Sequence, residues 1–218
     1  GIGSCKEELE MLSDPLNKRG VAVITPDMPG AGGAVIYNNV KCGGPQLEAA
    51  FDAIYKFIDS RNDLDSERIA NFGLCMGGGY AFRASAKRPN VKCCVSLFPL
   101  FMHLAEQTSI PVWMKKGKWS SYQTADNYLE GMKLIEEGTI STDFLMVHSD
   151  DDNWMTPEAT DKLYDKATGH KERIKITEKF VYVSEETIMH AMPVGEQYHW
   201  VKHEAADFIA QRLTGEVK

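Results

Sequence analysis

The sequence predicts an α/β fold, in which helices cover both faces of a mostly parallel sheet. Short apolar runs rich in β-branched residues alternate with stretches of helical periodicity along the 218 residues. Several of these runs are continuous rather than alternating, which is typical of strands buried on both faces of a parallel sheet. Strand–helix alternation of this kind indicates a doubly wound fold, and the length fits one domain covering residues 1–218.

The predicted elements follow one another in a regular order. Strands are predicted at residues 21–25, 68–74, 91–98, 143–148 and 179–183, and helices at residues 7–19, 46–60, 79–87, 157–168 and 198–213. Ser4 and Glu7 have the spacing of a capping box, so the first helix is expected to begin directly after Ser4. The stretch of residues 100–142 is longer than a crossover needs. Its aromatic residues favour a small helical cap, and a surface excursion with packing aromatics is the alternative.

Composition narrows the range of partners. A net charge of −7 argues against nucleic acid or an anionic membrane surface as a partner. No apolar run approaches the roughly 20 residues that a membrane-spanning helix needs. The odd count of five cysteines, with Cys93 and Cys94 adjacent, indicates reduced thiols and a cytoplasmic location. Cys-x-x-Cys pairs and zinc-finger spacing are missing from the sequence, so neither a metal nor a cofactor is expected.

Residues 73–78 read Gly-Leu-Cys-Met-Gly-Gly, between a predicted strand and a predicted helix. This is the context of a nucleophile elbow, in which Cys75 would sit on a strained turn. Gly73 and Gly77 are expected to lack side chains because a Cβ atom would clash there. A helix opening at Met76 would present free N–H groups that favour a thiolate and an oxyanion. The alternative, a phosphate-binding loop, fits poorly because Cys75 occupies the place of its middle glycine.

This box, with Ala81, Phe82 and the strand predicted at 91–98, resembles the dienelactone hydrolases. Residues 26–32, Pro-Asp-Met-Pro-Gly-Ala-Gly, are similar to α/β-hydrolases related to 2,6-dihydroxypseudooxynicotine hydrolase and to fungal polyketide-shortening hydrolases. The resemblance covers most of the chain as a pattern, and the box is its specific part. It implies the α/β-hydrolase fold and a catalytic triad in the chain order nucleophile, acid, histidine.

The same resemblance implies the acid. Residues 147–157 are similar to the family's His-Gly-x-x-Asp…Pro loop, with Ser149 in place of glycine. This places the acid at Asp152. Asp151 is the alternative, because the distance from Asp152 to Pro157 differs by one residue from the usual spacing. These aspartates would also suit the capping of a helix that begins at Pro157.

A base is expected in the loop beyond the last strand, where His190 lies in a His-Ala-Met step similar to that of dienelactone hydrolases. His199, at the start of the last predicted helix, is the alternative, and His148 is expected to pack or to fix a loop. The oxyanion hole would use the N–H of Met76 and one from Ile2 or Gly3. Aromatic side chains for binding substrate are expected at Trp113, Trp119 and Trp154.

The implied topology has a further consequence for the start of the chain. In the family a strand lies between those predicted at 21–25 and 68–74, and this sequence begins where that strand should have just ended. The resemblance therefore implies that N-terminal strands are missing, and an upstream segment, a second chain or a homodimer would supply the strand. The chain expressed alone is expected to be insoluble or inactive.

The expected reaction is hydrolysis of an ester, lactone or activated carbonyl through a thioester acyl-enzyme. The aromatic residues of the expected cap favour a small to medium apolar or aromatic substrate. An acyltransferase or cyclase would use the same acyl-enzyme, and cleavage of a β-diketone is a related possibility. The alternatives from other classes are a non-catalytic ligand-binding module of this fold and a redox sensor, for which the sequence nominates no resolving thiol.

Overall fold

The computed structural model describes residues 4–41, 44–100, 137–150, 152, 155–176 and 195–215. Within these ranges, four strands pair in parallel and in chain order: β1 (Ala70–Leu74), β2 (Cys93–Leu97), β3 (Asp143–His148) and β4 (Lys171–Lys175). β2 is buried along its whole length, whereas β1 and β4 lie at the two edges of this sheet. Parallel pairing directs the carboxyl ends of all four strands to one edge, where Cys75 follows β1 and Asp152 follows β3.

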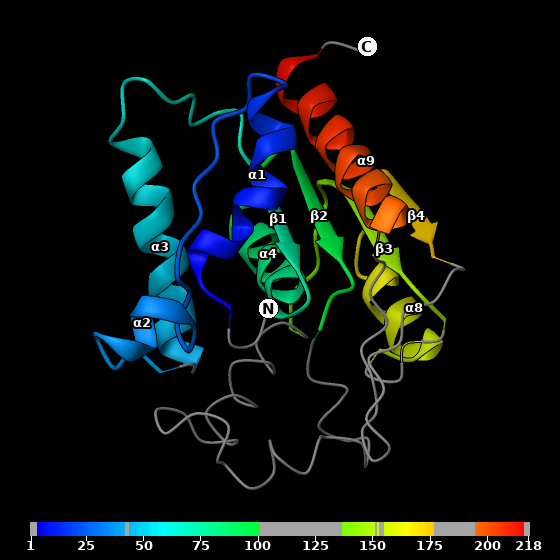
Figure 1. Ribbon diagram of the computed structural model, residues 1–218, viewed down its shortest axis with the longest axis horizontal. Coiled ribbons are helices and arrows are strands. Elements are labelled where there is room, and N and C mark those ends of the chain that lie inside the picture. Colours follow the sequence, from blue (N-terminus) through cyan, green and yellow to red (C-terminus); the bar gives the residue numbers. More distant parts are fainter. Residues whose placement is uncertain are drawn as a thin grey trace, which may run out of the picture.

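Helices cover both faces of the sheet, as predicted (Figure 1). One face packs against α1 (Glu10–Asn17) and α9 (Gly195–Thr214). The other packs against α3 (Gly44–Asp59), α4 (Met76–Lys87) and α8 (Pro157–Asp165). Side chains along β2 alternate between the two buried clusters, so Cys93 faces α9 and Cys94 faces α4, as the pleat of a strand requires.

The structure confirms the strands predicted at 68–74, 91–98 and 143–148. It differs from the prediction at both ends of the sheet. Residues 21–28 are extended but form no strand, because none of the described strands pairs with them. β4 was missed because its sequence, Lys-Glu-Arg-Ile-Lys, is too polar to read as a buried strand. Such charge is usual on an edge strand. The strand predicted at 179–183 lies outside the described residues.

Five predicted helices are present, with shifted ends, and a short sixth, α2 (Gly32–Ile36), was not predicted. The prediction of a capping box at Ser4 is wrong. The first helix of the described residues is a 3-10 helix, η1 (Lys6–Leu9), whose N-cap is Cys5 without a side-chain bond. The Lys6 N–H instead donates to the Asp27 carboxylate over 2.8 Å. A distant acid has thus taken the place of the local serine.

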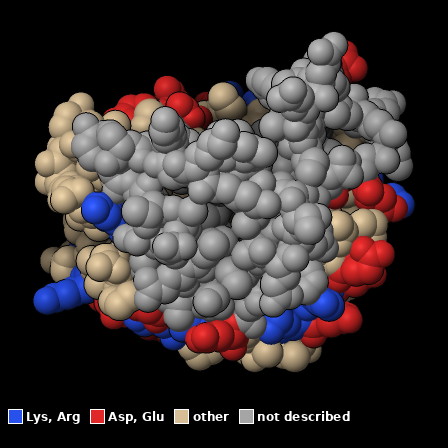
Figure 2. Space-filling model, turned by 90° about the horizontal axis from the view of Figure 1, so that it is seen from below, with Lys and Arg blue, Asp and Glu red and all other residues tan. Residues whose placement is uncertain are grey.

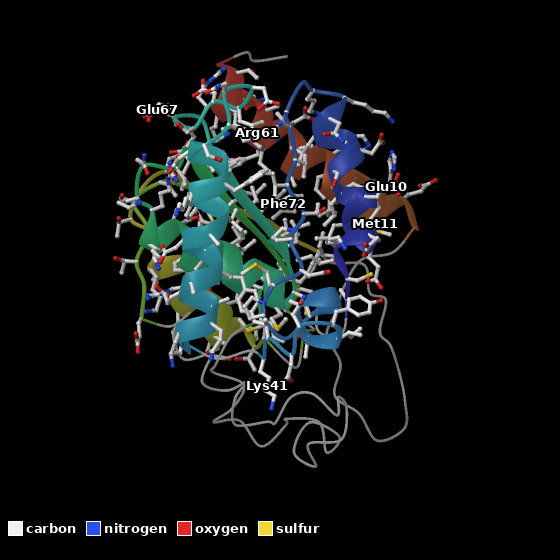
Figure 3. All side chains as sticks on the ribbon, turned by 90° about the vertical axis from the view of Figure 1, so that its left-hand side faces the viewer. Glu10, Met11, Lys41, Arg61, Glu67 and Phe72 are labelled. Atoms are coloured by element: carbon white, nitrogen blue, oxygen red, sulfur yellow. The ribbon has the colours of Figure 1, made fainter. Side chains whose placement is uncertain are left out.

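The described residues bear only partly on two further predictions, the cap and the absence of a membrane-spanning helix. The expected cap at about 100–142 falls mostly on residues 101–136, which are outside them. Among the helices that are described, none is both long enough and apolar enough to cross a bilayer. Figure 3 shows Phe72 of β1 in the interior between α3 and α1, whereas the labelled charged residues lie at the periphery.

Candidate active site

Cys75 occupies a strained turn between β1 and α4. Its backbone has φ 59° and ψ −124°, a conformation that residues with a side chain rarely adopt, and it is the N-cap of α4. Backbone hydrogen bonds hold the turn. The Cys75 N–H donates to the Leu97 carbonyl over 2.8 Å, and the Cys75 carbonyl accepts from the Leu100 N–H over 2.9 Å. The end of β2 therefore fixes the position of this residue, which is 7% exposed.

The glycines around Cys75 have different roles. A Cβ atom on Gly73 would lie 1.9 Å from the carbonyl oxygen of Gly77, so the prediction for Gly73 is confirmed. The same prediction is wrong for Gly77, whose Cβ would meet no described atom within 4 Å outside its own helix. Gly78 is the second tight position, because its Cβ would lie 3.0 Å from the Cα of Pro99. The glycines thus allow α4 to pack closely against β1 and the end of β2.

The first turn of α4 presents N–H groups beside Cys75. The first N–H groups of a helix have no partner within it. The Gly78 N–H donates back to the Cys75 carbonyl over 2.9 Å, whereas the Met76 N–H has no acceptor among the described residues. The helix dipole adds partial positive charge at the same end. A negatively charged sulfur or oxygen next to Cys75 would be stabilised there.

Asp152 lies at the same edge of the sheet, beyond β3, with only 3% of its surface exposed. Its Oδ1 accepts from the Met155 N–H over 3.0 Å, and its own N–H donates to the Ser149 carbonyl over 3.3 Å. Thr156 caps α8 by accepting from the Ala159 N–H over 3.3 Å. The alternative reading of Asp152 as the cap of that helix is therefore wrong, because the position directly before Pro157 is the one that reaches the free N–H groups.

His148 ends β3 and is buried, with 5% of its surface exposed. Neither ring nitrogen has a hydrogen-bond partner among the described residues, and Nδ1 lies 3.7 Å from an Asp150 carboxylate oxygen. Burial, with the Arg173 guanidinium as the next cause, lowers the pKa of His148. The prediction that His148 packs or fixes a loop agrees with this burial.

His199 is on the exposed side of α9, where its ring lies 4.5 Å from that of His203. Arg19 approaches His203 over 3.4 Å and forms an ion pair with Asp207 over 2.7 Å. Among the described residues, His199 therefore lies with side chains of the face shared by α1 and α9, not with Asp152. His190 is outside the described residues, as are Asp151, Ile2, Gly3, Trp113, Trp119 and Trp154.

Asp27 is a residue whose role the sequence did not reveal. Its carboxylate accepts from the Lys6 N–H over 2.8 Å and from the Gly33 N–H over 2.9 Å, so it joins the N-terminal segment to α2. The neighbouring Gly32, at φ +46°, has no room for a side chain, because its Cβ would lie 2.1 Å from an Asp27 oxygen. One sequence signal could have revealed this contact: two glycines follow the aspartate five and six residues later.

Figure 2 looks onto the molecule from below Figure 1, toward the edge where the strands end. Asp and Glu side chains alternate with Lys and Arg side chains around the described rim of this face. Two ion pairs that involve β4 also combine opposite charges: Lys175 pairs with Asp150, and Arg173 pairs with Asp161 over 2.7 Å. The described part of the rim therefore presents no extended surface of one sign.

The chain belongs to the α/β-hydrolase family: the family model described as alpha/beta hydrolase fold matches residues 1–164. Hydrolase ORFZ of Pyricularia oryzae is 41% identical to this chain over 88 residues, which are 38% of this chain and 20% of that protein. The 2,6-dihydropseudooxynicotine hydrolase of Paenarthrobacter nicotinovorans is 27% identical over 96 residues, 44% of this chain and 25% of that protein. The match thus spans about a fifth to a quarter of these relatives.

Solved structures support the same fold. The crystal structure of 2,6-dihydroxy-pseudo-oxynicotine hydrolase superimposes with a TM-score of 0.76 at 18% identity, covering 99% of this chain and 59% of that one. A lipolytic enzyme from the LipS and LipT study has a TM-score of 0.70 at 14% identity, covering 97% of this chain and 91% of that one. The predicted fold class and the resemblance to hydrolases of the pseudooxynicotine type are confirmed.

Proposed function

We propose that this chain carries the active site of a hydrolase that cleaves an ester, lactone or activated carbonyl through a thioester on Cys75. The observation that carries the proposal is the backbone of Cys75, held at φ 59° between β1 and the first turn of α4. Strain of this kind persists only where the surrounding structure imposes it, and it recurs at catalytic positions. Membership of a hydrolase family and the names of the relatives support the same class of reaction.

In the proposed reaction, His190 takes the proton of the Cys75 thiol while Asp152 orients the imidazole. The thiolate attacks the carbonyl carbon, and the Met76 N–H with an N–H of Ile2 or Gly3 stabilises the resulting oxyanion. The C–O bond to the leaving group breaks, and His190 returns the proton to the departing oxygen. Water, deprotonated by the same histidine, then cleaves the thioester and releases the acid.

Asp152 suits this role because it is buried and anchored. Its hydrogen bond with the Met155 N–H fixes the carboxylate at the carboxyl edge of the sheet. Asp151 remains the alternative acid, and His199 the alternative base. The substrate is proposed to be of small to medium size and apolar or aromatic, with Trp113, Trp119 and Trp154 as contacts. The proposed location is the cytoplasm.

Intact-protein mass spectrometry tests the proposal. The complete polypeptide is incubated with a panel of activated esters and lactones, and at least one is expected to add an acyl mass. Cys75→Ala should abolish that adduct, whereas Cys5→Ala should retain it. Cys75→Ser should slow acylation by about two orders of magnitude or more, because a hydroxyl is a weaker nucleophile than a thiol.

The outcomes separate the competing functions. Release of the free acid in plain buffer supports a hydrolase. An adduct that leaves only after an amine or alcohol is added would favour the acyltransferase or cyclase instead. If no compound acylates the protein, and iodoacetamide alkylates Cys75 no faster than Cys42, the non-catalytic binding module is the better description.

A further inference from the structure

α9 presents two histidines one helical turn apart on its outer side. His199 and His203 are separated by four residues, so their side chains lie on the same face of the helix. The centres of the two rings are 4.5 Å apart. The rings line an open hollow of the surface together with Gly195, Glu196 and Trp200. All five of these residues belong to α9, so a single helix forms the hollow.

The distance between the rings matches that of two imidazoles on one metal ion. Metal–nitrogen bonds of about 2.0–2.1 Å put two rings bound at angles between 90° and tetrahedral at centre-to-centre distances of about 4.5–5 Å. The observed 4.5 Å lies in this range. Two helical histidines with this spacing also bind zinc in the His-Glu-x-x-His motif. Here Trp200 stands where that motif has its glutamate, so the pair offers ligands without a general base.

The contacts of His203 leave one ring nitrogen for a metal. Its Nδ1 lies 3.4 Å from Arg19 Nη2, whereas no described residue forms a hydrogen bond with Nε2. Arg19 also donates to Asp207 over 2.7 and 3.0 Å and to the Pro15 carbonyl over 2.8 Å. The approach to His203 is therefore the longest of these contacts. The ring can carry its proton on Nδ1 and bind a metal through Nε2 while Arg19 keeps its shorter bonds.

The charges around the pair permit a cation there. Asp207 forms an ion pair with Arg19, and the ammonium group of Lys202 lies over the Tyr198 ring, 5.9 Å from its centre. Glu196 adds a negative charge in the same hollow. Among the described residues, no group of three or more His, Cys, Asp and Glu side chains could hold a metal. The two imidazoles would therefore be the protein ligands, and water would complete the coordination.

We propose that His199 and His203 together bind one divalent transition-metal ion on the surface of α9. Imidazole suits Zn²⁺, Ni²⁺ and Cu²⁺, and affinity at such a site is expected to be highest for Cu²⁺. Mg²⁺ and Ca²⁺ prefer oxygen ligands and should not bind. The sequence predicted no metal because it lacks Cys-x-x-Cys pairs and zinc-finger spacing, and a histidine pair on one helix is a different pattern.

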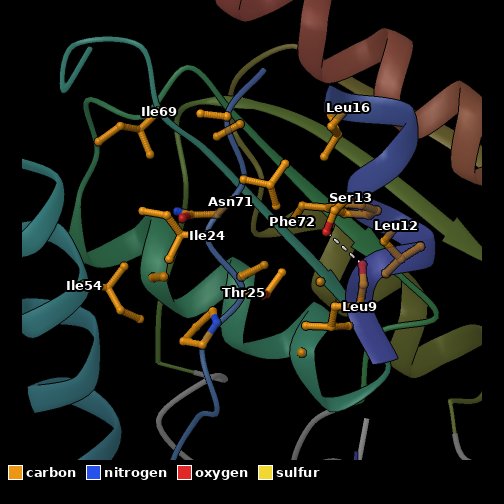
Figure 4. Close-up of a pocket in the computed structure, with 18 of the residues that line it drawn as sticks. Leu9, Leu12, Ser13, Leu16, Ile24, Thr25, Ile54, Ile69, Asn71 and Phe72 are labelled. Atoms are coloured by element: carbon orange, nitrogen blue, oxygen red, sulfur yellow. Dashed lines mark hydrogen bonds between the residues drawn. The ribbon is translucent and has the colours of Figure 1, made fainter. Parts of the chain in front are cut away.

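This site is separate from the apolar cavity beside β1 (Figure 4). That cavity has a volume of about 500 Å³, and no histidine is among the residues described in its lining. From α9 it is lined by Ile209, Leu213 and Thr214, toward the C-terminal end of the helix. A molecule in the cavity would therefore not occupy the histidine pair.

Titration of the complete polypeptide with Zn²⁺ tests the proposal. Isotopically labelled histidine allows NMR to follow each imidazole separately, so binding to thiols or to other histidines is not mistaken for this site. The signals of His199 and His203 are expected to shift together and to saturate at the same Zn²⁺ concentration. His170→Asn, which removes an exposed histidine elsewhere, should leave this behaviour unchanged. Mg²⁺ should shift neither signal.

Single variants show whether the two rings share one ion. His199→Asn should weaken Zn²⁺ binding at His203 at least about tenfold, and His203→Asn should do the same at His199, since each removes one of two ligands. The double variant His203→Asn/Glu204→His is the matched control. It keeps two histidines on α9 but places the second on a different face of the helix, so the affinity should not recover.

Three results would overturn the proposal. The first is the absence of any shift of the two signals with Zn²⁺. The second is binding at one ring that is unaffected by loss of the other, which would describe two independent histidines. The third is wild-type affinity in the double variant, because the spacing on the helix would then be irrelevant. The measurement is of binding and not of hydrolysis, so none of these results depends on the reaction proposed at Cys75.

Discussion

Gly73 and Gly77 approach each other so closely that a Cβ atom on Gly73 would lie 1.9 Å from the Gly77 carbonyl oxygen. This relationship brings the end of β1 against the first turn of α4 and sets the turn on which Cys75 is held. The contact is between backbone atoms, so it cannot be relieved by rotating a side chain. The two glycines nevertheless differ, because Gly77 has no described atom near its own Cβ position outside its helix.

We therefore predict opposite results for two matched substitutions. Gly73→Ala should lower the free energy of unfolding by about 3 kcal/mol or more, because the backbone must move. Gly77→Ala should leave it unchanged or raise it by up to about 1 kcal/mol, since alanine restricts the unfolded chain. Urea denaturation of both variants measures the difference. Equal destabilisation by the two substitutions would contradict the packing described here.

Asp27 provides the second prediction, because its carboxylate accepts N–H groups from two separate segments. Asp27→Ala should lower the free energy of unfolding by about 1–3 kcal/mol, mainly the cost of leaving the partly buried Gly33 N–H without an acceptor, because the exposed Lys6 N–H can bind water instead. If the residues before Lys6 form part of the oxyanion hole, kcat should fall more than KM rises. Asp27→Asn keeps one acceptor oxygen and should recover part of both losses. If Asp27→Ala leaves both stability and kcat unchanged, the two hydrogen bonds that Asp27 accepts have no role in either.

The thiols other than Cys75 lead to a third prediction. Burial raises the pKa of the Cys94 thiol to about 12, and it raises that of Cys93 as well. Both side chains are fully buried on opposite faces of β2. In native protein they should therefore react with a thiol reagent only through global unfolding, at rates that rise with urea. Alkylation of either one in native buffer at the rate of half-buried Cys5 would show that the sheet opens locally.

The sequence predicted the centre of this fold better than its edges, for a physical reason. β2 and β3 are buried on both faces, so continuous apolar runs marked them, whereas β4 is an edge strand whose Lys and Glu side chains reach solvent. Residues 21–25 have the composition of a strand but no neighbouring strand among the described residues, and composition cannot report whether a neighbour is present. Strand formation depends on a neighbour that is distant in sequence.

In the candidate site, too, the sequence could predict some features and not others. The turn at Cys75 and the start of the helix at Met76 could be predicted because such a turn needs only local features, a glycine two residues earlier and a helix start. Asp27 could not, because its partners, Lys6 and Gly33, come together only through the tertiary fold. The predicted capping box failed for the same reason: the Lys6 N–H finds an acceptor 21 residues away instead of the serine two residues before it.

His148 leads to the last prediction, a dependence of stability on pH. Burial and then the positive charge of Arg173 lower the pKa of its ring, while the unfolded chain binds a proton near the ordinary value of about 6.5. Between these two pKa values the unfolded state holds more protons, so stability rises with pH. The contribution of His148 is therefore complete above about pH 6.5 and is lost as the pH falls through its lower folded pKa.

Two variants isolate this effect. His148→Gln cannot titrate, and its free energy of unfolding should fall less steeply on acidification, by at most about 1.4 kcal/mol per pH unit. Arg173→Gln removes a charge that opposes protonation of the ring, so the folded pKa should rise toward its ordinary value and the window of lost stability should narrow. Urea denaturation between pH 5 and 8 measures both slopes, with the slope rather than the absolute stability as the readout. If wild type and His148→Gln have parallel profiles over that range, the histidine is not protonated on unfolding and its burial carries no dependence on pH.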